Sequence, residues 1–241
     1  MTIQNSQKYS PVVLLILDGW GVSQYQEGNA VALASTPNFD NYLKTYPNSQ
    51  LNPCGGNVGL ADGEKGNSEA GHLNIGAGRI VEQDKIKISR LIDENNPNNN
   101  FYSNQQFIEA FNHVKTNSSN LHLLGLLSDS QSAHVEQSHL FAILKLAHEN
   151  KIERVFLHLF TDGRDAPQHS APRFLAELKE KLFPEQKIAS ICGRFYAMDR
   201  NKRWDRTEQA YNLLVDGVGF ARASSVEEAI LQAYNRGETD E

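Results

Sequence analysis

The glycine-flanked serine in residues 66–72 (GNSEAGH) combines groups that a phosphoryl-transfer site needs. Ser68 stands where a short helix could begin, and a helix N-terminus offers backbone N–H donors and a partial positive charge to an alkoxide or a phosphate. A serine hydroxyl is a weak nucleophile until a neighbouring base or a metal ion activates it. His72 follows on the same helix face. The alternative interpretation is a glycine-rich loop with a capping serine.

Asp18 is the second candidate, because it closes the apolar run Val12–Leu17 and precedes Gly19. A carboxylate at the end of a buried strand is a common metal or phosphate-transfer position in α/β proteins. The alternative is an aspartate that caps a helix or a turn. Several other sites are excluded, because the chain has no P-loop, no G-x-G-x-x-G after a strand and no H-E-x-x-H.

Arginines follow two of the predicted strands. Arg164 lies in TDGRD, and Arg194 and Arg200 lie in GRFYAMDR. Residues 189–206 contain five basic and two acidic side chains, a local net charge of +3 in a chain of net −6. Guanidinium groups bind carboxylates and phosphates through paired N–H donors. This placement favours an anion pocket over a solvated surface, and His134, which follows another predicted strand, could join it.

These residues need a scaffold, and the chain alternates strand-like with helix-like segments. Apolar runs predict strands over 12–17, 121–127, 154–160 and 187–192. Helical patterns cover 37–44, 81–94, 105–115, 137–149, 171–182, 206–215 and 226–236, the last opening with the capping-box pattern Ser224-x-x-Glu227. Residues 52–78 read as long loops around one short helix, and 95–100 as a turn.

This order of elements predicts a parallel sheet with right-handed crossovers. Ligands bind at the carboxyl ends of parallel strands, so the polar loops that follow the last three predicted strands should converge on one pocket. The fold class expected from the pattern is therefore α/β.

Composition and charge exclude several classes of protein. The chain has 241 residues, 39% hydrophobic and 22% charged, which fits neither a disordered nor a collagen-like chain. A net charge of −6 argues against a surface that binds nucleic acid throughout. The longest apolar run is far shorter than the roughly 18 residues of a membrane span, and the first ten residues show no signal-peptide pattern. Cys54 and Cys192 form no CxxC, so a zinc ribbon is excluded; two reduced thiols are expected, with a lone disulfide as the alternative.

Four motifs together resemble one known family. They are LILDGWG (Leu15–Gly21), GNSEAGHLNIGAGRIV (Gly66–Val81), TDGRD (Thr161–Asp165) and GRFYAMDRNKRWDR (Gly193–Arg206). In this order, they resemble the cofactor-independent phosphoglycerate mutases of the alkaline phosphatase superfamily, and the resemblance runs from about Pro11 to the last residue. Periodicity alone does not name this family.

The resemblance implies a cytoplasmic isomerase that interconverts 3-phosphoglycerate and 2-phosphoglycerate in glycolysis and gluconeogenesis. It also implies two divalent metal ions, Mn²⁺ with Mg²⁺ or Co²⁺ as alternatives, and no 2,3-bisphosphoglycerate. By the same resemblance Ser68 accepts the phosphoryl group, giving a phosphoserine intermediate, and Asp18 and Ser68 are ligands of one metal. Five further residues match groups that hold the substrate: His134, Arg164, Asp165, Arg194 and Arg200.

The chain departs from the family pattern in one loop. The family shows two glycines and V-H-S-H after its Ser-Asp, whereas residues 128–136 read SDSQSAHVE, about one residue longer. His134 aligns with the first family histidine, and Glu136 replaces the second. Lys65 and Ala70 also stand where the family commonly has Met and Val.

The family architecture implies two incomplete domains in this chain. Members are roughly twice as long as its 241 residues, and a parallel-sheet transferase-like domain is inserted into a split alkaline-phosphatase-like domain. Residues 1–82 are expected to be the first piece of the phosphatase-like, metal-binding domain, and residues 83–241 part of the transferase-like, substrate-binding domain. The remaining metal ligands are expected downstream. Because residues 1–82 lack most of their sheet, we expect an exposed apolar patch beside Val12–Leu17.

Three functional interpretations follow. In the first, the chain is the amino-terminal part of a mutase, has little activity alone and has the missing carboxy-terminal half as its partner. In the second, it is a non-catalytic phosphoglycerate-binding fragment or a subunit of a split enzyme. In the third, it belongs to another phosphatase or phosphomutase of the same superfamily. All three have a small-molecule substrate or ligand, and neither nucleic acid nor a membrane is expected as a partner.

Overall fold

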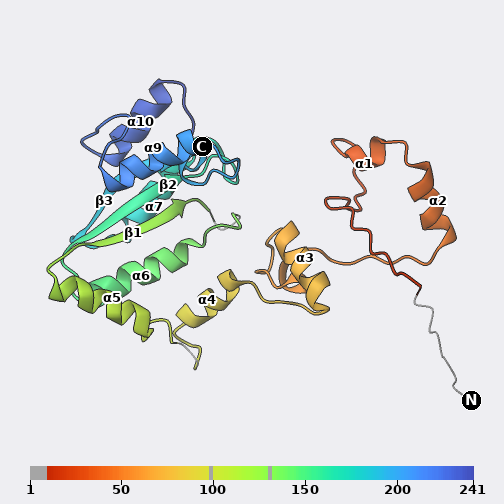
Figure 1. Ribbon diagram of the computed structural model, residues 1–241, viewed down its shortest axis with the longest axis horizontal. Helices are drawn as coiled ribbons and strands as arrows, with labels where there is room; N and C mark the ends of the chain where they lie inside the picture. Colours follow the sequence, from red (N-terminus) through yellow and green to blue (C-terminus); the bar gives the residue numbers. More distant parts are fainter. Residues whose placement is uncertain (1–9, 98–99, 130–131) are drawn as a thin grey trace, which may run out of the picture.

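Three parallel strands form the centre of the carboxy-terminal part of the molecule. The computed structural model describes residues 10–97, 100–129 and 132–241. Figure 1 shows the strands side by side, with helices above and below them. In spatial order they are β1 (Leu121–Leu127), β2 (Val155–Thr161) and β3 (Gln186–Gly193). The predicted parallel sheet, and with it the α/β fold class, is confirmed.

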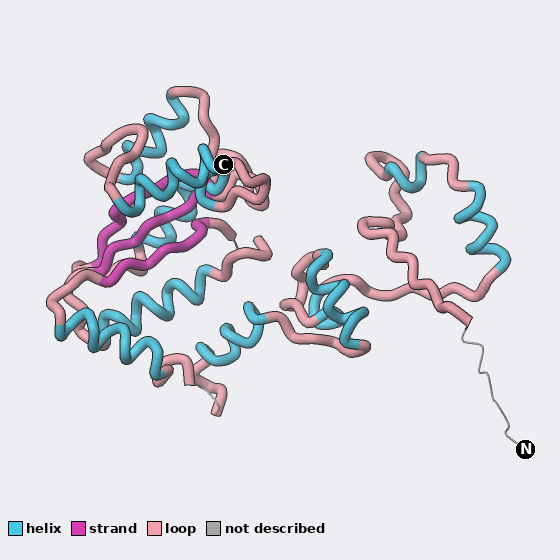
Figure 2. The backbone as a smooth tube through the Cα atoms, in the orientation of Figure 1, coloured by secondary structure: helices cyan, strands magenta, loops and turns pink. Residues whose placement is uncertain are grey.

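Helices make up most of the remaining regular structure, and none in the described ranges is long and apolar enough to cross a membrane. Figure 2 shows how they alternate with the strands and with long connecting loops. The helices before the sheet are α1 (Ala30–Leu33), α2 (Pro37–Thr45), the 3₁₀-helix η1 (Gly55–Val58), α3 (Ser68–Ala77), α4 (Asp84–Ile92) and α5 (Gln105–Thr116). Those after β1 are α6 (Gln137–Glu149), α7 (Ala171–Lys179), α8 (Arg194–Ala197), α9 (Trp204–Val215) and α10 (Val226–Asn235).

The sheet and the two crossover helices share one apolar core. Alternate residues of a strand point to the same face, and on β2 the positions Val155, Leu157 and Leu159 are almost fully buried. They belong to one cluster with apolar side chains of α6 and α7, including Leu144 and Leu175. Burial of each such side chain stabilises the fold by roughly 2 kcal/mol. This core fixes the strand ends, and therefore the loops that leave them.

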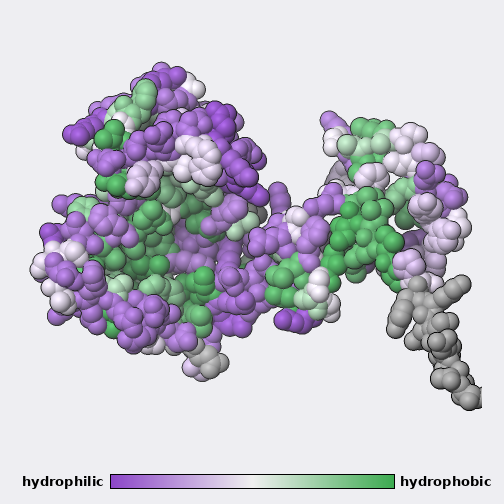
Figure 3. Space-filling view, viewed as in Figure 1, coloured by the Kyte–Doolittle hydropathy of each residue, from purple (hydrophilic) through white to green (hydrophobic). Residues whose placement is uncertain are grey.

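The predicted strand over Val12–Leu17 is wrong for this chain. No residue of the segment is in a strand, and Val12 is 96% exposed and Leu17 46% exposed. An extended segment becomes a strand only when a neighbour pairs with its N–H and C=O groups. The three described strands all belong to the carboxy-terminal sheet, and none of them pairs with this segment. The apolar patch expected here is present, and Figure 3 shows apolar surface on this part of the molecule.

The amino-terminal part has only a small core of its own. It consists of Val58, Leu60 and Ala70, and it is separate from the large cluster around the sheet. Figure 1 shows α1 and α2 on a long extended path, with α3 nearer to the sheet. The domain boundary at residue 82 stays a prediction.

Most helix predictions agree with the structure, with small shifts at the ends. The helix expected to begin at Arg206 begins at Trp204, and the one expected to reach Leu182 ends at Lys179. The capping-box prediction is wrong by one residue, because Ser225 caps α10 and its Oγ accepts a hydrogen bond from the Glu228 N–H at 3.1 Å. The pattern S-x-x-E also fits this later frame. Part of the 95–100 turn lies outside the described residues.

Candidate active site

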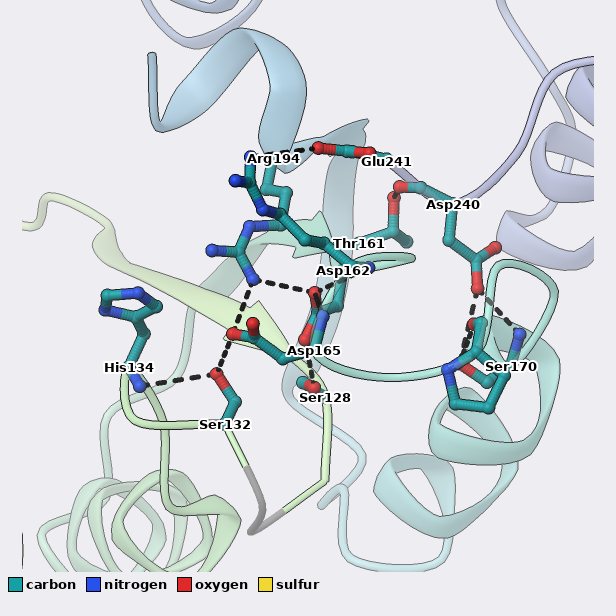
Figure 4. Close-up of polar contacts among 12 residues, drawn as sticks. Ser128, Ser132, His134, Thr161, Asp162, Asp165, Ser170, Arg194, Asp240 and Glu241 are labelled. Atoms are coloured by element: carbon teal, nitrogen blue, oxygen red, sulfur yellow. Dashed lines mark hydrogen bonds and ion pairs between the residues drawn. The ribbon is translucent and has the colours of Figure 1, made fainter. Parts of the chain in front are cut away.

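A buried aspartate ties together the loops that follow all three strands. Asp162, directly after β2, is 2% exposed. Its Oδ1 accepts hydrogen bonds from the backbone N–H groups of Arg164 (3.0 Å) and Asp165 (2.9 Å). Its Oδ2 accepts one from the hydroxyl of Ser128, which follows β1. Arg194, at the end of β3, donates from Nη1 to Oδ1 at 2.7 Å (Figure 4). The convergence of loops predicted from the parallel order is therefore observed.

A second carboxylate completes the cluster. Arg194 Nη1 also donates to Asp165 Oδ2 at 2.8 Å, so one nitrogen bridges two aspartates. The same Asp165 oxygen accepts a hydrogen bond from Ser132 Oγ at 2.8 Å. The Ser132 hydroxyl oxygen accepts from the backbone N–H of His134 at 3.3 Å. A chain of hydrogen bonds thus runs from the buried strand ends to the loop that carries His134. Ser130 and Gln131, in the loop that departs from the family pattern, lie outside the described residues.

The protonation states of this cluster follow from its hydrogen bonds. Burial alone would raise the pKa of Asp162, but hydrogen bonds from Ser128, two backbone N–H groups and Arg194 outweigh it and lower that pKa. The pKa of Asp165 is lowered in the same way, with burial opposed by hydrogen bonds from Arg194 and Ser132. Burial acts to lower the pKa of Arg194, yet the two carboxylates raise it. All three side chains are therefore charged at neutral pH.

The predicted substrate residues all line one cavity of about 550 Å³. It opens beside the carboxyl ends of the strands, where parallel sheets bind their ligands. The five are His134, Arg164, Asp165, Arg194 and Arg200. Arg194 is largely buried, whereas Arg164 and Arg200 are exposed. Their role in holding a substrate stays a prediction, but the structure does bring them together.

A third aspartate, Asp199, shapes the loop that carries Arg200. The Asp199 side chain is 2% exposed, and its Oδ2 accepts hydrogen bonds from the backbone N–H groups of Asn201 (3.1 Å) and Arg203 (2.8 Å). Its Oδ1 pairs with Arg206 Nη1 at 3.4 Å, and the Arg206 guanidinium lies over the Phe195 ring, 3.6 Å from its centroid. Arg206 is a further arginine on the cavity wall.

Ser68 and Asp18 form a separate group in the amino-terminal part. Ser68 is the first residue of α3, where Asn67 caps the helix, and its Oγ donates a hydrogen bond to Asp18 Oδ2 at 2.6 Å. His72 Nδ1 lies 2.8 Å from the Ser68 carbonyl oxygen and 3.2 Å from Oγ. A carbonyl oxygen only accepts, so this Nδ1 carries the hydrogen and does not take the serine proton. Asp18 is the acceptor that the geometry provides. Neither Asp18 nor Ser68 lines the arginine cavity.

The donors at Ser68 fit part of a metal site. A carboxylate and a serine oxygen 2.6 Å apart are oxygen ligands of the kind that hard divalent cations accept. The described residues contain no group of three or more His, Cys, Asp or Glu side chains that could hold a metal ion. Asp18 and Ser68 therefore supply a portion of one coordination sphere, and the two predicted metal ions need further ligands.

Asp162, Ser128, Ser132 and Asp199 belong to this site, and the sequence analysis did not single them out. The signal for Asp162 was present, because TDGRD places two aspartates after a strand. Ser128 stands in the same place after β1. The motif does not distinguish Asp165, which faces the cavity, from Asp162, which is buried at the strand end.

The fold and this site define an α/β protein with an arginine-lined cavity at the carboxyl ends of a parallel sheet. Residues 92–241 match the model of the family described as BPG-independent PGAM N-terminus. Because this match covers more than half of the chain, the chain belongs to that family, the amino-terminal region of 2,3-bisphosphoglycerate-independent phosphoglycerate mutases. The predicted family resemblance is confirmed.

Curated relatives agree along almost the whole chain. A 2,3-bisphosphoglycerate-independent phosphoglycerate mutase of Methanosarcina acetivorans is 48% identical over 238 residues, which are 98% of this chain and 45% of the relative. One of Clostridium tetani is 46% identical over 96% of this chain and 44% of the relative. The chain therefore spans less than half the length of these relatives.

A solved structure matches the fold as well. The crystal structure of Leishmania mexicana phosphoglycerate mutase at low cobalt concentration superposes with a TM-score of 0.75 and 31% sequence identity. The match covers 87% of this chain and 39% of that one. Since the match covers most of this chain, it supports the α/β architecture described above.

Proposed function

We propose that this chain is the amino-terminal part of a cytoplasmic phosphoglycerate mutase that interconverts 3-phosphoglycerate and 2-phosphoglycerate in glycolysis and gluconeogenesis. The observation that carries the proposal is the convergence of five family-matched residues, three of them arginines, on one cavity. Family membership names the substrate, and the cavity offers it cationic groups at the strand ends.

In this proposal the cavity holds the glycerate. Arg194 is fixed by two carboxylates and presents its remaining N–H groups, while the exposed Arg164 and Arg200 supply positive charge at the opening. Guanidinium groups bind carboxylate and phosphate through two parallel hydrogen bonds. Holding glycerate in place while the phosphoryl group is on the enzyme keeps it from leaving and limits reaction with water.

Ser68 is the group proposed to carry the phosphoryl. Its position at the start of α3 places its oxygen at the positive end of the helix. Asp18 accepts the hydroxyl hydrogen bond and orients Oγ, and His72 Nδ1, which donates to the Ser68 carbonyl oxygen, lies 3.2 Å from the same Oγ. Both contacts stabilise or orient the oxygen that is to attack phosphorus, and both come from residues within this chain.

Asp18 and Ser68 are the residues of this chain proposed to hold a divalent metal ion, Mn²⁺ in the first instance and Mg²⁺ or Co²⁺ as alternatives. When bound, such an ion favours the serine alkoxide and neutralises charge on the phosphoryl group. No 2,3-bisphosphoglycerate is needed, because the serine itself receives the phosphoryl group. With two of the needed ligands in hand, the 241 residues alone are expected to bind phosphoglycerate without turning it over.

That expectation also defines the alternative, a non-catalytic phosphoglycerate-binding chain or a subunit of a split enzyme. The incomplete donor set at Ser68 favours it for the 241 residues taken by themselves. A phosphatase or another phosphomutase of the same superfamily is the third candidate, and it differs in releasing phosphate from general phosphomonoesters.

The test is a titration of the 241-residue chain with 3-phosphoglycerate, followed by calorimetry or NMR. We expect saturable binding that is lost in Arg194→Ala and Arg200→Ala and kept in the control Arg222→Ala, an exposed arginine outside the cavity. Mutase turnover should appear only after a carboxy-terminal chain is supplied with Mn²⁺.

Each outcome has a separate meaning. Binding without turnover in the combined chains favours the non-catalytic alternative, and phosphate release without isomerisation favours the phosphatase. Equal binding by all variants, or none by the parent chain, contradicts the proposed role of the cavity.

A further inference from the structure

Asp162 is fully engaged with the protein and does not reach the cavity. Its carboxylate accepts four hydrogen bonds: two from backbone N–H groups of its own loop, one from Ser128 and one from Arg194. Its side chain is 1% exposed, and it is absent from the residues that line the cavity. Arg194 and Asp165, by contrast, do line it. Asp162 therefore cannot touch a bound ligand, and it acts through neighbours that can.

This arrangement fixes the orientation of the Arg194 guanidinium. Its Nη1 is held at 2.7 Å by Asp162 and at 2.8 Å by Asp165. The guanidinium is planar, so fixing one nitrogen from two sides fixes the plane of the whole group. Within the described residues, no hydrogen bond engages Nε or Nη2 of Arg194. That edge is the pair of donors that binds a carboxylate or phosphate in bidentate fashion.

We infer that Asp162 is a positioning residue of the substrate site, which fixes Arg194 so that its Nε–Nη2 edge is ready for an anionic group of the ligand. The inference rests on the proposed function, because it assigns a role within the same cavity. Asp162 also holds the backbone of Arg164 and Asp165, so one buried carboxylate sets the geometry of loops after β1, β2 and β3.

Electrostatics and positioning predict opposite results, which makes the inference testable. A negative charge beside an anion site opposes anion binding, so Coulomb's law alone predicts tighter binding when Asp162 is made neutral. Positioning predicts weaker binding, because one of the two charged hydrogen bonds that orient Arg194 becomes a weaker bond to a neutral amide oxygen. Asp162→Asn distinguishes electrostatics from positioning, since the amide keeps the size of the side chain and loses the charge.

The first experiment observes Arg194 without any ligand, by NMR of the arginine side chains in ¹⁵N-labelled 241-residue chain. We expect slow rotation of the Arg194 guanidinium, with separate Nη signals, in the parent chain. The signals should merge in Asp162→Asn and broaden in the milder variant Ser128→Ala, which removes one anchor of the carboxylate and keeps its charge. Glu238→Gln is the control, because it also neutralises an acidic partner of an arginine, but on the exposed pair with Arg236.

The second experiment is binding of 3-phosphoglycerate by the same variants, with folding checked by circular dichroism. We expect the Kd to rise about tenfold in Asp162→Asn, the loss of roughly one well-formed charged hydrogen bond, and to stay unchanged in Glu238→Gln. Unchanged Arg194 signals, or unchanged or tighter binding in Asp162→Asn, overturn the inference. If Asp162→Asn does not fold, Ser128→Ala decides by the same two readouts. Failure of the parent chain to bind 3-phosphoglycerate contradicts the proposed function, and the Arg194 spectrum still decides whether Asp162 orients the guanidinium.

Discussion

Asp240 should be a main determinant of stability in the sheet-containing part of the chain. It is 3% exposed, and its Oδ2 accepts hydrogen bonds from the backbone N–H groups of Ser170 (2.7 Å) and Ala171 (2.8 Å) at the start of α7. Its Oδ1 accepts one from the hydroxyl of Tyr234, and burial together with this carboxylate raises the pKa of Tyr234. Its backbone oxygen accepts from Thr161 Oγ1 at 2.5 Å. One carboxylate thus caps α7 and joins it to α10.

Asp240→Ala removes these contacts and leaves the α7 amides and a phenol without their partner. Loss of a capping side chain costs about 0.5–2 kcal/mol, and a hydrogen bond to a charged group contributes about 1.5–3 kcal/mol. Since the bonds share one carboxylate they do not add fully, and we expect about 3 kcal/mol in total. For a chain of this size that corresponds to a fall in Tm of about 6–12 °C. Asp240→Asn should fall about half as far, because one amide oxygen still accepts.

The assay is thermal unfolding followed by circular dichroism at neutral pH. Glu238→Ala is the matched control, because it lies on the same segment but makes an exposed ion pair with Arg236, and exposed pairs contribute little. A Tm for Asp240→Ala within about 2 °C of the parent chain would refute the reasoning, since it would mean that these buried contacts contribute less than about 1 kcal/mol.

Three further predictions concern the site and the amino-terminal part. Arg194→Ala should lower the free energy of unfolding by about 3–5 kcal/mol, because it leaves Asp162 buried without its cation. Arg200 is exposed, so Arg200→Ala should leave the free energy of unfolding unchanged. Urea unfolding of the two variants measures the difference. Asp162 and Asp165 have folded pKa values below their unfolded ones, so the stability they add is present above about pH 4 and is lost as the pH falls through the folded pKa. When the free energy of unfolding is measured from pH 2 to 7, it should fall less steeply toward acid pH in Asp162→Asn than in the parent chain. Equal falls in the two proteins would contradict this prediction. Leu15→Lys should reduce binding of a hydrophobic dye, because Leu15 is 78% exposed in the apolar patch, and unchanged dye fluorescence would show that the patch is covered in solution.

The sheet could be predicted from the sequence because its strands pair with near neighbours along the chain. Leu121–Leu127 and Val155–Thr161 pair with each other, and the helix between them covers the same core. Apolar runs and helical periodicity carry all the information needed when both partners are present. The predicted range of the first strand is the observed one, and that of the second, 154–160, is shifted by one residue.

Val12–Leu17 shows the limit of the same reasoning. Its composition is that of a buried strand, but a strand is a property of a pair, and the chain offers this run no described neighbour. A sequence pattern indicates which side chains a segment could bury, and the segment forms a buried strand only if a partner strand is present. The chain spans less than half the length of these curated relatives.

For the site, residue types were predictable and geometry was not. Arginines after strands predicted a cavity with positive side chains, and the cavity is there. The distinction between Asp165, which lines it, and Asp162, which is buried beneath it, depends on which way the backbone turns after β2. That turn is set by the hydrogen bonds that Asp162 itself accepts, and the motif TDGRD does not show which of its two aspartates accepts them.

The charge balance of the cavity determines how strongly this chain can hold a phosphoglycerate. Four arginines line it, and three of them already pair with carboxylates: Arg164 with Glu241, Arg194 with Asp162 and Asp165, and Arg206 with Asp199. Arg200 has no ion pair within the described residues. A phosphoglycerate carries both a phosphate and a carboxylate. Because most of the cavity arginines already pair with carboxylates of the protein, the cavity orients such a ligand more than it attracts it. We therefore expect weak, salt-sensitive binding by the 241 residues, with affinity rising only when further cations are brought to the same cavity.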